Sequence, residues 1–138
     1  MIDRFVDAQH GNYKTALEEI KNGKKKTHWM WFIFPQIKGL GDSDISKYFA
    51  IQSMGEAEEY LAHPILGSRL FEISEYLLYL ETNDPVEIFG GVDALKLQAS
   101  MTLFWEISRK DVFRDILLKY FGGYLDYQTM QILRSMEQ

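Results

Sequence analysis

The stretch HWMWFIFPQIKGLG, residues 28–41, contains the most apolar run in the chain. Across the seven residues from Trp29 to Pro35, the only polar side-chain group is the indole N–H of tryptophan. A transmembrane helix needs roughly 18 apolar residues, so this run does not cross a bilayer. As a helix it is apolar on nearly every side, and as a strand it is apolar on both faces. We therefore expect a short, buried, central helix that ends at Pro35.

Helical signals dominate the remaining sequence. Apolar residues spaced three and four apart form stripes, the clearest being Leu66, Leu70, Ile73, Leu77 and Leu80. Residues suited to helix N-caps are Asn12, Ser43 or Asp44, Ser53, Asp84 and Asp126. A short helix is expected after Asp84 and a separate one over 92–108. We predict one all-α domain over residues 1–138, with about seven to eight helices, several short, around the central aromatic segment.

Composition excludes several classes of protein. The 138 residues fit one compact domain, and the lack of cysteine removes disulfides, thiolate nucleophiles and cysteine-ligated zinc. The N-terminal MIDRFVDAQH lacks the long apolar region of a signal peptide, so we expect a cytoplasmic protein. A net charge of −5 is opposite to the basic surface that binds nucleic acid. The three histidines show no metal-ligand spacing, so neither a metal nor a cofactor is expected.

One helical face in the segment DALKLQASMTLF changes from polar to apolar along its length. Asp93, Lys96 and Ser100 share this face with Leu97, and Phe104 continues it. A face that enters the core should not be polar without partners. One interpretation is an Asp93–Lys96 pair at a solvated helix end. The other is a polar cavity at the edge of the core, where Lys96 binds an anionic group.

Two further features suggest where an anion could bind. Arg69 lies in the first turns of a helix, where a cation opposes the helix dipole, so we expect a partner such as Asp93 or a ligand phosphate. The loop with Gly39 and Gly41 leads into a helix start at Ser43, an arrangement that can bind an anion through backbone N–H groups. A plain turn and helix cap is the favoured interpretation of that loop.

The histidines offer the only side chains that ordinarily titrate near neutral pH. His28 opens the aromatic run and can cap, hydrogen-bond in the core, or act as an acid or base. His63 precedes Pro64 at a helix junction, where we expect it to satisfy a free carbonyl.

Five segments together resemble a known family. They are RFVDAQ (4–9), HWMWFIFPQIKGLG (28–41), YLAHPILGSRL (60–70), DALKLQASMTLF (93–104) and GGYLDYQTMQIL (122–133). They are similar to the bacterial family called domain of unknown function 1810, across essentially the whole chain. The resemblance implies a small, mainly helical, single-domain fold named Rv1873-like, with no assigned function. It draws attention to one group of residues: His28, Gln36, Ser43, Tyr48, His63, Arg69, Asp93, Lys96 and Ser100.

The functional hypothesis is binding of a small anionic or nucleotide-like ligand, with no nucleic-acid or membrane partner. Trp29 and Trp31 would supply stacking surface, Lys96 and Arg69 would meet negative charge, and Gln36 would contact a polar edge. Ser43, Tyr48, His63 and Ser100 complete the predicted binding residues. One alternative is a hydrolase or glycosidase for a nucleotide or ADP-ribose-like substrate, with His28 or Asp93 as the acid–base group. The other is a structural or interaction protein.

Overall fold

The computed structural model describes residues 2–137, and these residues form nine helices and no strand. The helices are α1 (Asp3–Gln9), α2 (Tyr13–Lys21), α3 (Met30–Ile33), α4 (Asp44–Phe49), α5 (Met54–Ala62), α6 (Leu66–Tyr79), α7 (Pro85–Ser108), α8 (Asp111–Phe121) and α9 (Tyr127–Met136). The predicted all-α class is confirmed. No helix in this part of the chain is both long and apolar enough to cross a membrane.

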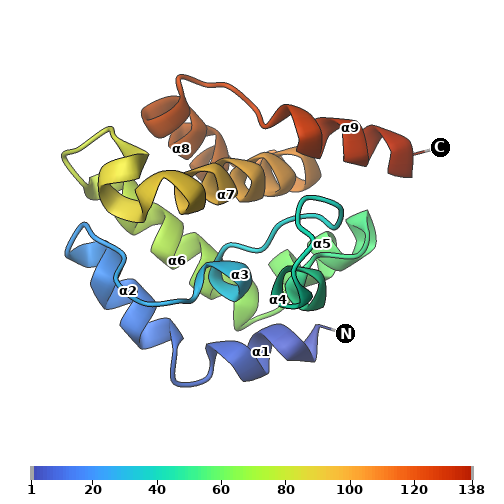
Figure 1. The fold of residues 1–138 in the computed structure, drawn as a ribbon, viewed down its shortest axis with the longest axis horizontal. Helices are drawn as coiled ribbons and strands as arrows, with labels where there is room; N and C mark the ends of the chain where they lie inside the picture. Colours follow the sequence, from blue (N-terminus) through green and yellow to red (C-terminus); the bar gives the residue numbers. More distant parts are fainter. Residues whose placement is uncertain (1, 138) are drawn as a thin grey trace.

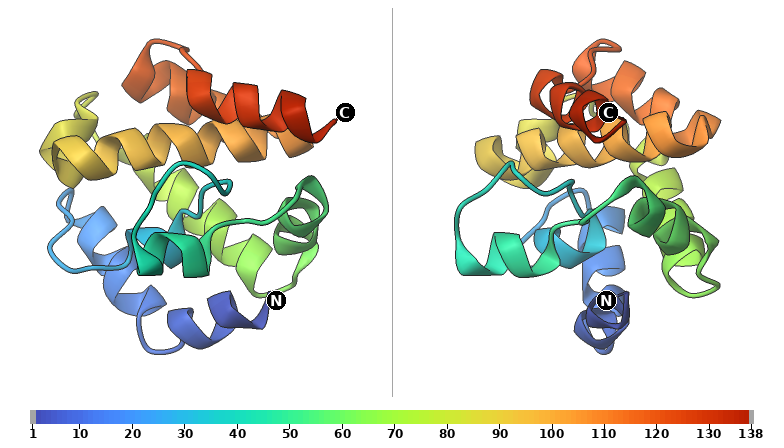
Figure 2. Two further views of the ribbon diagram at one scale, coloured as in Figure 1. Left: turned by 45° about the vertical axis from the view of Figure 1, so that its right-hand side comes forward. Right: turned by 90° about the vertical axis from the view of Figure 1, so that its right-hand side faces the viewer.

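The helices pack on either side of α6. Figure 1 shows α7, α8 and α9 above it and α1 and α2 below it, and the turned views in Figure 2 agree. Helix α6 contacts α2, α5 and α8, whereas α7 contacts α5, α8 and α9. The short helices α3 and α4 contact each other, and α3 also contacts α1. The loop between α3 and α4 passes beside α7 (Figures 1 and 2).

The stripe predicted on α6 forms part of the core. Its buried members are Leu66, Leu70, Ile73 and Leu77, and Leu80 follows the helix as its partly buried C-cap. Gly67 lies on the same helix where α5 approaches closely. A Cβ at this position would be 2.0 Å from the carbonyl oxygen of Leu61, so only glycine fits.

The aromatic segment is a short buried helix, as predicted. Helix α3 spans one turn, and its buried residues with their neighbours are Trp29, Met30, Phe32, Ile33 and Phe34. Trp31 is the exception, because it is only partly buried. Phe89 of α7 packs edge-on against both Trp29 and Phe34, at centroid distances of 6.3 and 6.1 Å.

The predicted break before residue 92 is confirmed: α7 spans Pro85 to Ser108, but its backbone is not helical at Gly90, so α7 consists of two helical segments. Gly90 adopts φ 80° and ψ 167° inside this helix. Glycine has no Cβ and tolerates this conformation, so the first segment ends at the glycine and the second starts after it in a new direction. Asp84 caps the start as expected, since its side chain accepts a hydrogen bond from the backbone N–H of Val86.

Most of the predicted N-caps are confirmed, with one correction. The side chains of Ser43, Ser53 and Asp126 accept hydrogen bonds from the backbone N–H groups of Ser46, Glu56 and Thr129. Asn12 precedes α2, but its side chain makes no such bond. Its amide instead donates to the carbonyl of Ala8, 2.7 Å away, and so closes the end of α1.

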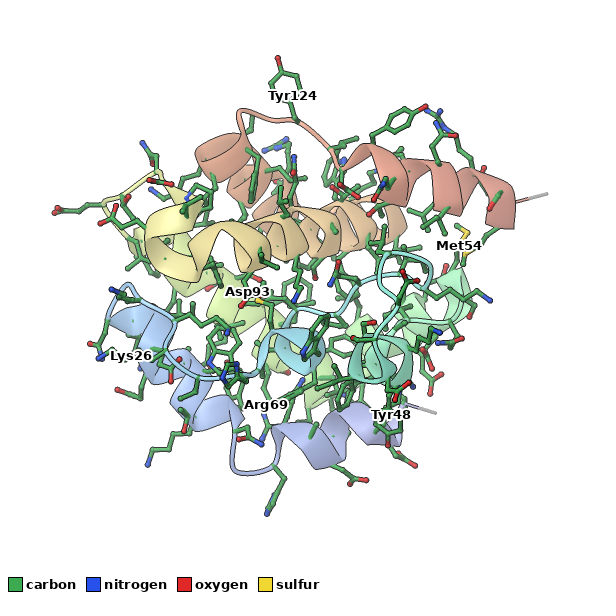
Figure 3. The ribbon with its side chains drawn as sticks, viewed as in Figure 1. Lys26, Tyr48, Met54, Arg69, Asp93 and Tyr124 are labelled. Carbon is green, nitrogen blue, oxygen red and sulfur yellow. The ribbon has the colours of Figure 1, made fainter. Side chains whose placement is uncertain are left out.

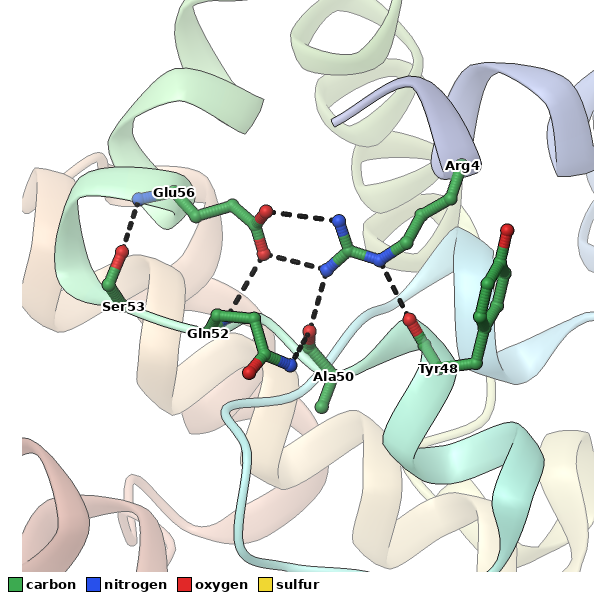
Figure 4. A network of polar contacts seen from close by, with 6 residues as sticks. All are labelled: Arg4, Tyr48, Ala50, Gln52, Ser53 and Glu56. Atoms are coloured by element: carbon green, nitrogen blue, oxygen red, sulfur yellow. Dashed lines mark hydrogen bonds and ion pairs between the residues drawn. The ribbon is translucent and has the colours of Figure 1, made fainter. Parts of the chain in front are cut away.

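A network around Arg4 ties α1 to the chain between α4 and α5 (Figure 4). The guanidinium donates to the carbonyls of Tyr48 and Ala50, each at 2.7 Å, and makes two bonds to Glu56 at 2.7 and 3.0 Å. Burial alone would raise the pKa of Glu56, but hydrogen bonds from Arg4 and the Gln52 backbone hold it below its usual value. The network fixes the end of α4.

Candidate functional site

A pocket of about 670 Å³ lies between α7, the loop after α3, α4 and the start of α9. This volume is within the usual range for sites that hold small molecules. Four of the residues proposed from the sequence line it, namely Trp31, Gln36, Ser43 and Lys96. These side chains come from α3, α4's N-cap, α7 and the loop between α3 and α4, so the fold brings together residues up to 65 positions apart.

A single parallel bridge, Ile37 with Ile51, holds the pocket's loop in place. The Lys38 N–H donates to the Ile51 carbonyl at 2.9 Å, and the Ile51 N–H donates to the Gln36 carbonyl at 2.8 Å. Both isoleucines are buried. The backbone after α3 is therefore anchored in the core, while Gln36 stays partly exposed beside the pocket.

The glycine loop packs tightly on α4, in agreement with the turn-and-cap interpretation. A Cβ on Gly41 would lie 2.7 Å from the hydroxyl oxygen of Ser46. Gly39 has φ 103°, a conformation that side chains other than glycine rarely adopt. Ser43 accepts from the Ser46 N–H, and Ser46 Oγ donates back to the Ser43 carbonyl at 2.8 Å.

Lys96 is held against an indole ring at the pocket wall. Its Nζ lies 3.5 Å from the centroid of the Trp31 ring and 3.2 Å from Asp93 Oδ1. The predicted Asp93–Lys96 ion pair is thus confirmed, and it borders a pocket as the second interpretation requires. The Lys96 side chain is 18% exposed, so the ammonium is largely shielded from bulk water.

A second lysine shares the same carboxylate. It belongs to the run Lys24–Lys26, for which the sequence favours a solvated loop over a phosphate-binding patch. Lys25 Nζ lies 2.9 Å from Asp93 Oδ2, and the Lys25 side chain is 8% exposed. Its ammonium also donates to the Thr27 carbonyl at 2.6 Å. Because two ammonium groups, Lys25 and Lys96, flank the one carboxylate of Asp93, this cluster keeps one positive charge.

Arg69 does not pair with Asp93, which corrects one of the two expected partners. Figure 3 shows Asp93 by α7 and Arg69 on the side of α1 and α2. The Arg69 guanidinium donates to Gln9 Oε1 at 3.3 Å and lies 5.0 Å from the ring centroid of Tyr13. The Gln9 amide in turn donates to the buried Tyr60 hydroxyl at 2.9 Å. Arg69 therefore belongs to a polar network on the α1 side of the core.

The two histidines of the hypothesis lie outside the pocket lining. His28 is exposed. His63 Nδ1 accepts from the backbone N–H groups of Ile65 and Leu66, at 3.1 and 3.3 Å. The expectation that His63 satisfies a free carbonyl is wrong, because at this junction the free groups are the amides that begin α6.

The remaining proposed residues lie in the interior or on the surface, outside the pocket lining. The Tyr48 ring is exposed, whereas Ser100 is buried and its hydroxyl has no hydrogen-bond partner among the described residues. Trp29 is buried, and its indole N–H donates to Glu19 Oε1 at 2.9 Å. Within residues 2–137, no group of three or more His, Asp or Glu side chains could hold a metal ion.

Glu19 is a buried acid that the sequence analysis missed. Its carboxylate accepts from the N–H groups of Lys26 and Thr27, the Thr27 hydroxyl and the Trp29 indole, at 2.7–3.0 Å. Burial alone would raise its pKa, but these four bonds lower it to about 2. The available signal was its position on α2, beside Ile20 and three residues after Ala16, on the buried stripe. Glu19 thus anchors the loop that leads to α3.

Comparisons with known proteins agree with this fold and leave the chemistry open. The model of a family described as "Protein of unknown function (DUF1810)" matches residues 1–133. A similar solved structure is that of the conserved hypothetical protein Rv1873 from Mycobacterium tuberculosis, at 42% identity and a TM-score of 0.94, covering 96% of each chain. No curated protein matches the sequence.

Proposed function

We propose that this chain, which belongs to the DUF1810 family of proteins of unknown function, binds a small anionic, nucleotide-like ligand in the pocket beside Trp31. The observation that carries the proposal is the placement of Lys96, whose ammonium lies 3.5 Å from the Trp31 ring centroid at the pocket wall. This ammonium group is held on an aromatic ring and is partly shielded from water. It can therefore bind an anion without a change in the conformation of its side chain.

The charges around Lys96 support this proposal. Asp93 alone would neutralise Lys96, but Lys25 shares the same carboxylate and leaves the cluster with one positive charge. The pocket lining adds Lys38 and Lys47, against the carboxylates of Asp42 and Asp126. On a chain with a net charge of −5, an anion site has to be local like this one.

The uncharged lining favours a ligand that carries hydroxyl or amide groups besides its charge. Gln36, Gln52 and Gln128 all line the pocket, and each amide can both donate and accept hydrogen bonds. Phosphorylated sugars and nucleotides present such groups around a phosphate. A simple anion such as phosphate would leave most of these amides facing water.

A thermal-shift comparison of three proteins tests the proposal. The proteins are the wild type, Lys96→Met and the control Lys14→Met, since Lys14 is an exposed lysine of α2 away from the pocket lining. AMP, ADP-ribose, ribose 5-phosphate and succinate are the probes. A ligand at 100 times its Kd adds about 2.7 kcal/mol to stability, which raises Tm by several degrees.

We expect at least one phosphorylated probe to stabilise the wild type and Lys14→Met equally, and Lys96→Met much less. Methionine keeps most of the side-chain volume of lysine but carries no charge, so the comparison isolates the ammonium group of Lys96. The proposal fails if none of the probes raises the Tm of the wild type. It also fails if the shifts are the same in Lys96→Met.

A further inference from the structure

Helix α7 has two apolar faces where a helix at the surface normally has one. One face enters the core with Ala94, Leu97, Met101 and Phe104, all buried. The other carries Val92, Leu95 and Ala99, spaced three and four apart, so they share a stripe along the helix. Val92 is 70% and Leu95 65% exposed, although both are aliphatic.

The second stripe is a wall of the same pocket. Val92, Leu95 and Ala99 line it together with Lys96, which lies on this face four residues after Val92. Leu40 of the loop after α3 adds an apolar side chain to the lining. Exposed aliphatic side chains grouped beside a positioned cation are a feature of binding sites. Apolar surface in contact with water is unfavourable, so a ligand that covers it gains binding free energy.

We infer that the ligand of this pocket is amphiphilic, with a flat apolar ring on Val92 and Leu95 and an anionic group on Lys96. The inference rests on the proposed function and specifies its ligand class. Lys96 comes one turn of about 5 Å after Val92 and directly after Leu95, so the ring and the anionic group would lie next to each other along the helix. A nucleoside monophosphate has this design, since its sugar separates the base from the phosphate.

The stripe points to the apolar half of the ligand, and Lys96 to the anionic half. A sugar phosphate or a dicarboxylate would satisfy Lys96 but leave Val92 and Leu95 in water. A nucleoside would cover the two aliphatic side chains but leave the positive charge of the cluster unmatched. Only a ligand with both parts would contact both the aliphatic side chains and the positive charge.

Isothermal titration with AMP, ribose 5-phosphate, adenosine and inorganic phosphate separates these contributions. We expect wild-type protein to bind AMP at least about tenfold more tightly than ribose 5-phosphate or adenosine, because each lacks one contact. Leu95→Ser should weaken AMP about tenfold and leave ribose 5-phosphate unchanged. Lys96→Met should weaken both phosphorylated probes.

Val86→Ser is the matched control, because Val86 is a 52% exposed valine in the first segment of α7, outside the pocket lining. It should bind AMP as the wild type does. Since Val86 and Leu95 are both exposed, neither serine variant removes a core contact, and circular dichroism melting curves verify that both fold.

The outcomes distinguish this inference from the proposed function. If AMP and ribose 5-phosphate bind equally and Leu95→Ser changes neither, the anion site stands and the amphiphilic ligand is refuted. If none of the phosphorylated probes binds, the proposed function itself fails. If sedimentation shows that the wild type self-associates and Leu95→Ser does not, the stripe is an interface between copies and the inference is overturned.

Discussion

Replacing Glu19 by glutamine tests whether a buried charge holds the loop that leads into α3. The carboxylate oxygen Oε1 accepts from the N–H groups of Lys26 and Thr27 and from the Trp29 indole, whereas Oε2 accepts only from the Thr27 hydroxyl. A glutamine can keep its oxygen in the place of Oε1. Its amide then faces the Thr27 hydroxyl, which can turn and accept. Glu19→Gln therefore removes the charge and preserves the bonding pattern.

The magnitude follows from the pKa of Glu19, which falls from 4.5 to about 2 in the folded chain. A depression of this size corresponds to at most about 3 kcal/mol of stabilisation by the charge. Contact of the surrounding loop with solvent reduces it, so we expect Glu19→Gln to lower the free energy of unfolding by about 1–3 kcal/mol at neutral pH. Glu19→Ala should cost more, because the buried Trp29 indole N–H then loses its partner.

Urea unfolding of both proteins between pH 7 and pH 2.5 provides the assay. Because the folded pKa of Glu19 is depressed, the stabilisation by its charge is complete above the unfolded value of 4.5 and is lost as the pH falls towards about 2. The stability difference between wild type and Glu19→Gln should therefore be constant above about pH 5.5 and shrink below it. A difference that stays constant down to pH 2.5, or is absent at pH 7, would refute this account of the loop.

Two further predictions concern packing. Gly67→Ala should destabilise by about 3 kcal/mol or more, since the new Cβ would lie 2.0 Å from the Leu61 carbonyl oxygen, whereas Gly91→Ala, with open space around it in α7, should be neutral or stabilising by up to about 1 kcal/mol. Equal melting temperatures for these two variants would contradict the close approach of α5 and α6. Trp29→Ala should cost about 3–5 kcal/mol in urea unfolding and Trp31→Ala clearly less, because only Trp29 is fully buried; equal costs would place Trp31 in the core.

The fold could be predicted from local pattern because most of its helices carry an apolar stripe or a capping residue of their own. The stripe on α6 and the caps at Ser53 and Asp126 are such local signals, and they were sufficient to predict the helices to which they belong. The break inside α7 was predictable in the same way. The glycine pair Gly90–Gly91 predicted a boundary between two helices, and Gly90 forms it with a positive φ that residues with a side chain rarely adopt.

The ion pairs of the candidate site were predicted only where one helix contains both partners. Asp93 and Lys96 are three residues apart, so a helical wheel pairs them. Lys25 reaches the same carboxylate from 68 positions earlier in the chain, and it reads there as one of three solvated lysines. For Arg69, the existence of a partner was predicted but its identity was not. Its helix-start position correctly indicated a partner, but that partner is Gln9, a neutral residue that charge-based reasoning does not consider.

Trp31 shows why one apolar run can build both the core and the pocket. Helix α3 is a single turn, so its side chains point in all directions around the axis. Its neighbours α1 and α4 and the nearby α7 cover most of these directions, and Trp31 takes the one that opens on the pocket. Lys96 then covers the exposed ring. A substitution at Trp31 would therefore disturb packing and binding together, whereas Lys96 and Leu95 touch the pocket from a helix whose other face holds the core. Substitutions of these two residues should keep the fold, so a change in ligand affinity reports on the pocket itself.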